Sequence, residues 1–304
     1  MNTICIEQNG ERQLQRLAAQ RSLYSSAKTS FAVHAVLSTF AAAGFAFWAL
    51  LSPGVKPYAV LWGIGLTGLD LFWLSGSQKK QREQAALVQE SFDCEVLGLP
   101  WQPIKVGKAV DHELVVERAA LYRRREPGLE SLRDWYPVDV CGMPLFLARV
   151  VCQRINAWWD AKQRRRYALL LAGLVVVLLV VLVIVGIARG VSVADLLVST
   201  LGPLSSGIWL ATKQYRENAA AAARLEKLKE HAQEFWNRAL KGASESDLAG
   251  ESRALQDELF ESRRHNVPVF DWFYRRLRDE HESQMRATAA ELVRQLEAAR
   301  ENCT

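Results

Sequence analysis

The chain has 304 residues, of which 50% are hydrophobic and 23% are charged, and its formal net charge at pH 7 is +5. This hydrophobic content is high for a chain that also carries so many charged residues, which indicates that apolar and charged residues occupy separate parts of the sequence. The mild net charge is not the polybasic profile of a nucleic-acid-binding protein, so we expect no direct DNA or RNA binding. Almost no charge occurs in four stretches, residues 31–51, 58–74, 167–188 and 193–211.

These four stretches predict transmembrane helices. Each reaches or approaches the roughly 20 apolar residues that cross a hydrocarbon core of about 30 Å. The third stretch, residues 167–188, is apolar on every face, which excludes a core helix of a soluble protein with one side in water. A signal peptide is excluded for the first stretch, because the largely polar residues 1–30 precede it.

Lysine and arginine flank the apolar stretches on one side only, so the positive-inside rule predicts the orientation. The short loops 52–57 and 189–192 hold one cation each and are expected to face outward. We therefore expect a multi-pass membrane protein with both termini in the cytoplasm. Its predicted order is a cytoplasmic helical arm (1–30), a transmembrane hairpin (31–74), a cytoplasmic insert (75–166), a second hairpin (167–211) and a cytoplasmic helical tail (212–304).

In chain order, hydrophobic spacings of three and four residues predict helices through most of the polar sequence. The arm is expected to run as one helix into the first apolar stretch, and the insert to begin with a helix over residues 78–96. Glycine and proline make residues 101–110 a short strand or a loop. Asp111 is then placed to cap a further helix.

The second half of the chain predicts longer helices. Residues 144–188 are expected to form one helix that enters the third apolar stretch, and residues 208–240 one that leaves the fourth. A polar link over 243–252 precedes helices over 255–264 and 268–300, the last with its proline in the first turn. The predicted fold class is an all-α membrane protein with four transmembrane helices in two hairpins and a mainly helical cytoplasmic domain.

No enzymatic motif is present, because the sequence lacks the GxSxG, HExxH, Walker-type and dinucleotide-binding patterns. Its five histidines are scattered, and its five cysteines show neither CxxC nor Cys/His ligand spacing. We therefore expect no catalytic residue, no metal and no cofactor. The cysteines are expected to be reduced thiols in a cytosolic setting.

Ionisable and small residues within the apolar stretches are candidates for function. His34 and Asp70 are expected at similar depth, where they either pair or lie hydrated at the membrane interface. Small residues are concentrated in the second and fourth stretches, where they either pack against a neighbouring helix or line a pore. These small-residue candidates are Gly65, Gly68, Ser199, Ser205, Ser206 and Gly207.

Arginines lie close to aromatic residues in three polar segments. Aromatic faces stack on bases and guanidinium groups bind phosphates, so this composition suits a nucleotide ligand. The alternative is that the aromatic residues form domain core or an interfacial belt, while the arginines are solvated or bind anionic headgroups. The candidate ligand-binding residues are Arg123, Arg124, Arg125, Trp135, Tyr136, Arg263, Arg264, Trp272 and Arg275.

Short strings of residues along the chain carry a resemblance to a known family. They are Gln8-Asn9, Tyr24, Ala27-Lys28, Gln89-Glu90, Phe92-Asp93, Trp101, Asp134-Trp135-Tyr136-Pro137, Arg154-Ile155-Asn156, Trp159-Asp160, Leu255-Gln256-Asp257, Arg263-Arg264 and Tyr274. In these residues the chain resembles the SMODS-associated four-transmembrane effectors, pore-forming proteins encoded beside bacterial cyclic-oligonucleotide synthases in anti-phage defence. The resemblance implies an effector that senses a cyclic di- or trinucleotide, permeabilises the inner membrane and stops the infected cell.

Four helices in one chain are too few to enclose a wide aqueous lumen, so a pore requires a homo-oligomer. Two other classes of function remain open from the sequence. One is a membrane-anchored interaction protein whose helical tail docks a cytosolic partner. The other is a small transporter that uses His34 and Asp70 as a proton relay.

Overall fold

The computed structural model describes residues 2–51, 58, 61, 65, 68, 75–188, 190, 192 and 202–301. Within these residues the chain is helical, with nine α-helices, two 3-10 segments and no strand. The elements are α1 (Ile4–Glu7), α2 (Glu11–Leu51), α4 (Ser75–Val96), α5 (Pro103–Val106), α6 (His112–Arg123), η3 (Glu130–Leu132), η4 (Val138–Gly142), α7 (Leu145–Ala188), α9 (Gly202–Leu240), α10 (Glu245–His265) and α11 (Asp271–Glu301). The all-α prediction is confirmed for the described part of the chain.

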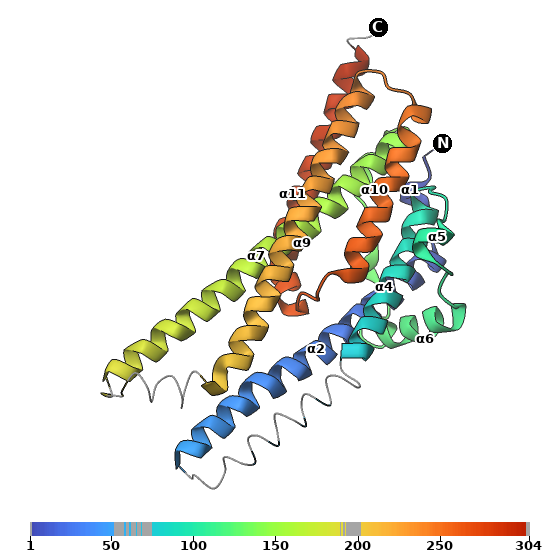
Figure 1. Ribbon diagram of the computed structural model, residues 1–304. Coiled ribbons are helices and arrows are strands. Elements are labelled where there is room, and N and C mark those ends of the chain that lie inside the picture. The colour runs from blue at the N-terminus through green and yellow to red at the C-terminus, as the bar shows by residue number, and fades with distance from the viewer. Residues whose placement is uncertain are drawn as a thin grey trace.

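Three long helices, α2, α7 and α9, project together from one end of the molecule, away from both chain ends (Figure 1). Helices α7 and α9 pack side by side. As the sequence predicts, the arm enters the first apolar stretch within one helix, α2. The prediction of one helix over residues 144–188 is confirmed by α7. The long helices therefore connect the body of the molecule directly to its projecting end.

The core of the body is formed by segments that are far apart in the sequence. One cluster of buried side chains takes Leu17 from the arm, Phe92 and Leu132 from the insert, Trp236 from α9 and Leu292 from α11. Truncating a buried side chain of this size, such as Trp236, to alanine costs about 3–5 kcal/mol. Arm, insert and tail thus fold together as one helical body.

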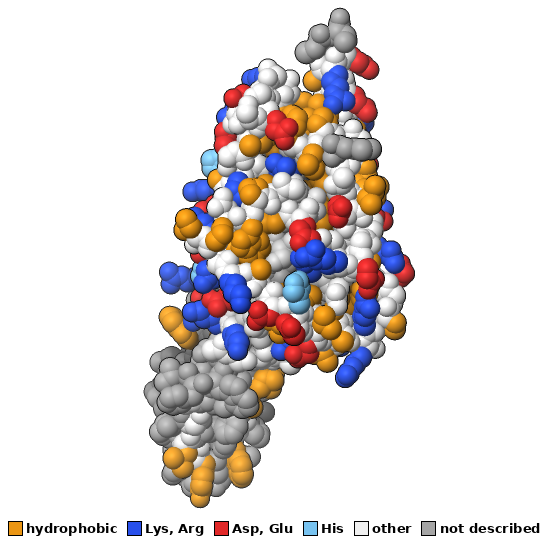
Figure 2. Space-filling model, turned by 90° about the vertical axis from the view of Figure 1, so that its right-hand side faces the viewer, with side chains coloured by type: hydrophobic (Ala, Val, Ile, Leu, Met, Phe, Trp, Pro, Cys, Tyr) orange, Lys and Arg blue, Asp and Glu red, His pale blue; other side chains and the backbone are white. Residues whose placement is uncertain are grey.

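Apolar side chains are exposed along the projecting part of α7. Leu169, Val177 and Ile187 are 64%, 59% and 76% exposed. Figure 2 shows charged side chains of both signs over the body and hydrophobic ones at the projecting end. As far as the structure describes them, none of the helices combines the length and the apolar content needed to cross a membrane.

Large parts of two predicted stretches lie outside the described residues. Of residues 58–74, the structure describes only 58, 61, 65 and 68. Of the fourth stretch, residues 193–201 lie outside the described residues, and residues 202–211 belong to α9. The predicted hairpin loop 52–57 also lies outside.

Four local predictions are wrong in detail. Residues 103–106 form the short helix α5 and not a strand or loop, because Pro103 supplies the backbone angle that a first helical turn requires. Asp111 precedes α6 but makes no side-chain cap. Helix α10 begins at Glu245, inside the predicted polar link, because Ser244 and Asp247 form a reciprocal capping box. Pro268 precedes α11, which begins at Asp271.

Candidate functional site

A cavity of about 580 Å³ lies where arm, insert and tail meet. Helices α2, α4, α7, α10 and α11 contribute to its wall, together with residues 130–136 and 266–269. Its volume lies within the range of about 300–1,000 Å³ that is typical of small-molecule sites. Basic residues outnumber acidic ones in the lining. The basic residues are Arg21, Lys28, Arg82, Arg133, Arg164, Arg263, Arg278 and Arg286, and the acidic ones are Glu130, Asp134, Asp160, Asp271 and Glu282.

A buried network around Asp93 anchors two residues of the cavity wall. The Oδ1 atom of Asp93 accepts a hydrogen bond from the Tyr136 hydroxyl at 2.7 Å. Its Oδ2 atom accepts from Gln256 Nε2 at 2.9 Å and from Arg263 Nη1 at 2.5 Å. Burial alone would lower the pKa of Arg263, but the Asp93 carboxylate raises that pKa above its ordinary value. Because a guanidinium has five N–H donors, Arg263 can hold Asp93 and still offer donors to the cavity.

The same network ties α4 to α10 through a second buried carboxylate, Glu90. Its Oε1 atom accepts from Arg253 Nη2 at 2.7 Å, and its Oε2 atom accepts from Gln256 Nε2 at 2.8 Å. Burial and the neighbouring Asp93 raise the pKa of Glu90. Gln256 therefore bridges two carboxylates one turn apart on α4, and this bridge fixes the position of α10, which carries Arg263.

Arg21 is held between two aromatic rings of the wall. Its guanidinium carbon lies 5.2 Å from the centroid of Trp135 and 4.5 Å from that of Tyr274. Its Nη2 atom donates to the Tyr274 hydroxyl at 2.6 Å. Among the described residues, neither Arg21 Nε nor Oε1 of the buried Gln20 has a hydrogen-bond partner. The wall thus combines a cation, flat aromatic faces and unmade hydrogen bonds, which an anionic ligand with ring systems would satisfy.

Several other cations of the wall are already neutralised. Lys28 Nζ lies 2.6 Å from Asp271 Oδ1. Burial lowers the pKa of Lys28 although this carboxylate opposes the shift. Arg164 pairs with Asp160 at 2.9 Å and Arg278 with Glu282 at 2.5 Å, whereas Arg21, Arg82 and Arg286 have no carboxylate partner within the described ranges. The unneutralised positive charge of the cavity resides on these last three residues.

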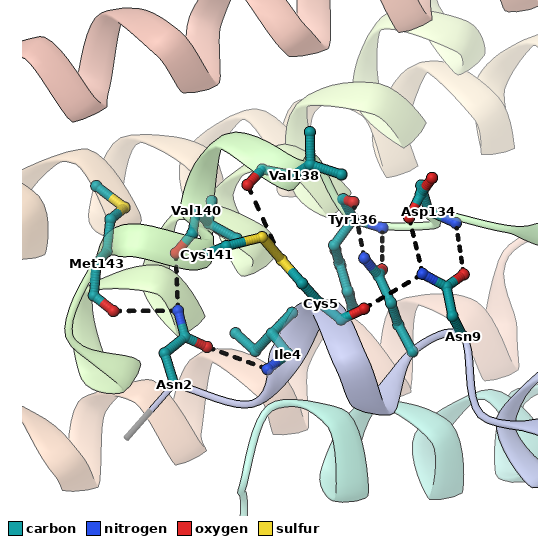
Figure 3. The surroundings of a disulfide bond; sticks show 11 residues. Asn2, Ile4, Cys5, Asn9, Asp134, Tyr136, Val138, Val140, Cys141 and Met143 are labelled. Atoms are coloured by element: carbon teal, nitrogen blue, oxygen red, sulfur yellow. Dashed lines mark hydrogen bonds between the residues drawn. A yellow bond between two sulfur atoms is a disulfide. The ribbon is translucent and has the colours of Figure 1, made fainter.

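An amide clamp from the start of the chain positions the aromatic wall (Figure 3). The side chain of Gln8 forms two bonds with the backbone of Tyr136, accepting from its N–H at 2.7 Å and donating to its carbonyl at 3.3 Å. Asn9 Nδ2 donates to Asp134 Oδ1 at 2.8 Å, and Asn9 Oδ1 accepts from the Asp134 backbone N–H at 3.0 Å. Asp134 has a positive φ of 48°, so the clamp also holds a backbone conformation that is uncommon for this residue type.

A disulfide between Cys5 and Cys141 lies beside this clamp and joins α1 to η4 (Figure 3). The prediction of reduced cysteines is therefore wrong for this pair. Two cysteines separated by 136 residues show no sequence spacing that would reveal their pairing. Cys94 and Cys152 are free and buried, as predicted, and burial raises the pKa of Cys94 to about 12.

The model of the family described as SMODS-associating 4TM effector domain matches residues 2–292. The chain belongs to this family. It is also 22% identical over 285 residues to a protein of Bacillus cereus (strain VD146) named probable CBASS effector molecule, and this match covers 88% of the chain and 90% of that protein. No solved structure matches the chain.

The resemblance to the four-transmembrane effector family is thus confirmed, and the residues that carried it lie largely around the cavity. Glu90, Asp93 and Gln256 lie directly behind the wall, in the buried network. The residues of those strings that line the cavity are Tyr24, Lys28, Gln89, Asp134, Trp135, Tyr136, Ile155, Asn156, Trp159, Asp160, Arg263 and Tyr274.

The structure brings three of the nine predicted ligand-binding residues together in this cavity, namely Trp135, Tyr136 and Arg263. The other six are Arg123, Arg124, Arg125, Arg264, Trp272 and Arg275, and none of them lines it. Arg123 pairs with Glu11 and Arg264 lies 3.5 Å from Glu83. Their role in ligand binding stays a prediction.

Sequence reasoning missed Arg21, Arg82 and Tyr274 as residues of the site. The two arginines were interpreted only as cations that flank an apolar stretch. Tyr274 stands in the strings that carry the family resemblance, so those strings contained a usable signal. Proximity of arginine to an aromatic residue in the sequence selected three residues of the cavity and six that lie outside it, because neighbours on a helix point to different faces.

The membrane candidates are only partly covered by the structure. Asp70 and Ser199 lie outside the described residues, and the side chains of His34, Ser205 and Ser206 are not described either. A Cβ atom added to Gly65 or Gly68 would meet no other atom within 4 Å. Gly207 lies in α9 and is partly exposed. Pairing of His34 with Asp70 and a pore-lining role for the small residues remain predictions.

Proposed function

We propose that this chain is an effector of bacterial anti-phage signalling that a cyclic di- or trinucleotide activates at this cavity. A cyclic oligonucleotide carries one negative charge per phosphodiester and flat bases, so its site needs cations and stacking faces together. The observation that carries the proposal is the position of Arg21 between Trp135 and Tyr274, with hydrogen-bonding atoms left unpaired beside it. The name of the Bacillus cereus relative, probable CBASS effector molecule, supports the effector role.

The proposed output is permeabilisation of the inner membrane by a homo-oligomer. Two helices that line the cavity, α2 with Lys28 and α7 with Arg164, continue into the projecting apolar segments. A ligand that draws these residues together would therefore move the helices that lead to both hairpins. The ligand shifts the equilibrium between the inactive and the active conformation only through its different affinity for these two states. To change the ratio of active to inactive protein from 1:99 to 99:1, it must bind the active conformation about 10⁴-fold more tightly, a difference of about 5.5 kcal/mol.

Insertion as two hairpins with both termini in the cytoplasm is part of this proposal. The family description as a four-transmembrane domain supports it, as do the exposed apolar side chains of α7. Cysteines substituted at Lys56 or Arg189 should react with a membrane-impermeant maleimide added outside the cell, whereas one at Gly107 should be protected. Labelling of residue 107 from the periplasm would overturn the two-hairpin arrangement.

Calorimetry on the full chain in detergent, with a panel of cyclic di- and trinucleotides, tests the ligand. Arg21→Gln should weaken binding by about tenfold or more, the effect of about 1.4 kcal/mol, because it removes an unneutralised cation from the wall. Arg276→Gln is the matched control, because Arg276 is exposed on α11 and does not line the cavity. Unchanged binding by Arg21→Gln, or no binding of any nucleotide by the parent, would contradict the proposal.

Dye release from proteoliposomes tests the output separately. Release should require both the nucleotide that binds in calorimetry and an intact Arg21. Nucleotide binding without release would instead favour the alternative of a membrane-anchored interaction protein. The transporter alternative depends on His34 and Asp70, and no contact between them is described.

A further inference from the structure

A second cavity, of about 450 Å³, adjoins the linker between α10 and α11. Asn266 and Val267 of this linker line both cavities. Most of the remaining lining comes from α9, at spacings of three and four residues that place the side chains along one face of the helix. These residues are Trp209, Thr212, Lys213, Arg216, Glu217, Ala220 and Arg224.

Three cations of the second cavity make no ion pair with any described carboxylate. Within the described part of the chain, Lys213, Arg216 and Arg224 have no carboxylate at ion-pair distance, and Arg224 Nη2 only donates to Asn266 Oδ1 at 3.2 Å. Elsewhere in the body most arginines at cavities are paired with carboxylates, as Arg164 is with Asp160. Lys213 and Arg216 lie about one turn apart on this helix face, and Arg224 lies about two turns further along it. Three cations on one helix face match the several acceptor oxygens of a phosphate group.

One carboxylate in the same cavity lacks a donor. The Oε2 atom of Glu217 is buried and has no hydrogen-bond partner among the described residues. Among those residues, Arg82 of α4 interacts with the Glu217 carboxylate through its charge but makes no ion pair with it. A buried carboxylate oxygen without a donor is costly, so a partner is expected. A pure anion would leave Glu217 unsatisfied and would be repelled by it. A group that carries a phosphate and a primary ammonium satisfies both sets of residues.

The location of the cavity indicates where such a group comes from. The apolar stretch proposed to span the membrane ends at residue 211, immediately before Lys213. Trp209, which is 67% exposed, lies one turn before the cations, as interfacial tryptophans do at the headgroup level. This step rests on the proposed membrane insertion.

We propose that the second cavity binds the headgroup of phosphatidylethanolamine. Lys213, Arg216 and Arg224 hold the phosphate, and Glu217 accepts hydrogen bonds from the ammonium. Choline carries no N–H donor and glycerol carries no positive charge, so phosphatidylcholine and phosphatidylglycerol each satisfy only one half of the site.

Titration of dihexanoyl lipids into the full chain in detergent, followed by tryptophan fluorescence, tests the assignment. The ethanolamine lipid should bind about tenfold more tightly than the choline lipid, the factor that corresponds to about 1.4 kcal/mol. Glu217→Gln should abolish the preference for the ethanolamine lipid over the glycerol lipid. Lys213→Gln should weaken the binding of all three. The matched controls are Glu230→Gln and Lys227→Gln, since both residues are exposed on α9 and lie outside the cavity.

Equal binding of the three lipids by the parent, or an undiminished ethanolamine preference in Glu217→Gln, would overturn the proposal. A separate titration with soluble O-phosphoethanolamine distinguishes a lipid from a free metabolite. This compound should bind much more weakly than the lipid, and equally tight binding would overturn the lipid assignment. None of these measurements uses a cyclic nucleotide or dye release, so their failure is distinguishable from failure of the proposed function.

Discussion

Replacing Asp93 should be among the most destabilising single changes in the body of this protein. Asp93 is fully buried and accepts hydrogen bonds from Tyr136, Gln256 and Arg263. Asp93→Leu keeps the branched arrangement of the heavy atoms, although methyl groups are larger than oxygens, and it leaves the guanidinium of Arg263 buried without its carboxylate. Breaking a buried ion pair by removing one partner costs about 3–5 kcal/mol.

The size of the effect can be measured by thermal unfolding of the full chain in detergent, followed by tryptophan fluorescence. A loss of 1 kcal/mol lowers Tm by about 2–4 °C in domains of roughly 150–250 residues, so Asp93→Leu should lower Tm by about 6–10 °C or more. Tyr136→Phe removes the hydrogen bond donated to the Asp93 carboxylate and the one accepted from Asn156 Nδ2, and should cost about 1.5 kcal/mol or more. Asp279→Ala, at an exposed position of α11, is the control and should leave Tm unchanged.

A double variant separates the lost ion pair from general damage to the core. Adding Arg263→Met to Asp93→Leu removes the stranded charge, and hydrophobic replacement of a whole buried pair is often close to neutral. The double variant should therefore regain part of the Tm that Asp93→Leu loses. A Tm for Asp93→Leu within 2 °C of the parent, or no recovery in the double variant, would refute the buried network as described.

Three further predictions follow from individual side chains. Burial, Lys162 and Arg166 lower the pKa of His281 from 6.5 to about 4. As the pH falls, the unfolded chain therefore binds a proton at His281 before the folded chain does, and the stability that His281 contributes is lost between about pH 6.5 and pH 4. His281→Phe should flatten the dependence of Tm on pH in that window, and an unchanged slope would assign it to other groups. The disulfide closes a loop of 136 residues, worth up to about 5 kcal/mol by loop entropy, so a reductant should lower Tm of the parent but not of Cys141→Ser. Gly65→Leu and Gly207→Leu should abolish oligomers in cross-linking, because bulk prevents close helix approach, and normal assembly of both would place these faces toward lipid.

Helix positions were predictable where the sequence contains breakers. The helix expected over residues 78–96 ends at Val96, immediately before Gly98 and Pro100. The start of α10 was missed although its signal was present, because Ser244 and Asp247 have the spacing of a capping box. Polar composition was given more weight there than cap chemistry. Periodicity therefore located the long helices, and cap residues would have corrected this boundary.

The candidate site depended on contacts that no local pattern contains. Arg21 and Tyr274 are 253 residues apart in the sequence, and Asp93 and Arg263 are 170 apart. Local adjacency of arginine and aromatic residues suggested a type of chemistry that stays a prediction, and three of the nine residues that it selected, Trp135, Tyr136 and Arg263, line the cavity. It could not tell which faces of α2, α7 and α11 meet, because that depends on how the helices pack.

The linker between α10 and α11 connects the two proposed sites with the two helices of the second hairpin. Arg164 of α7 donates to the Val267 carbonyl at 2.8 Å, and Arg224 of α9 donates to Asn266 at 3.2 Å. A nucleotide bound in the first cavity and a headgroup bound in the second, as we propose, would therefore act on the same two residues. If binding of the nucleotide changes the affinity for the headgroup by some factor, thermodynamic linkage requires that binding of the headgroup change the affinity for the nucleotide by the same factor. Affinity for dihexanoyl phosphatidylethanolamine measured with and without the activating nucleotide, and nucleotide affinity measured with and without the lipid, should differ by one common factor. A factor of one in both experiments would show that the linker transmits nothing between the cavities.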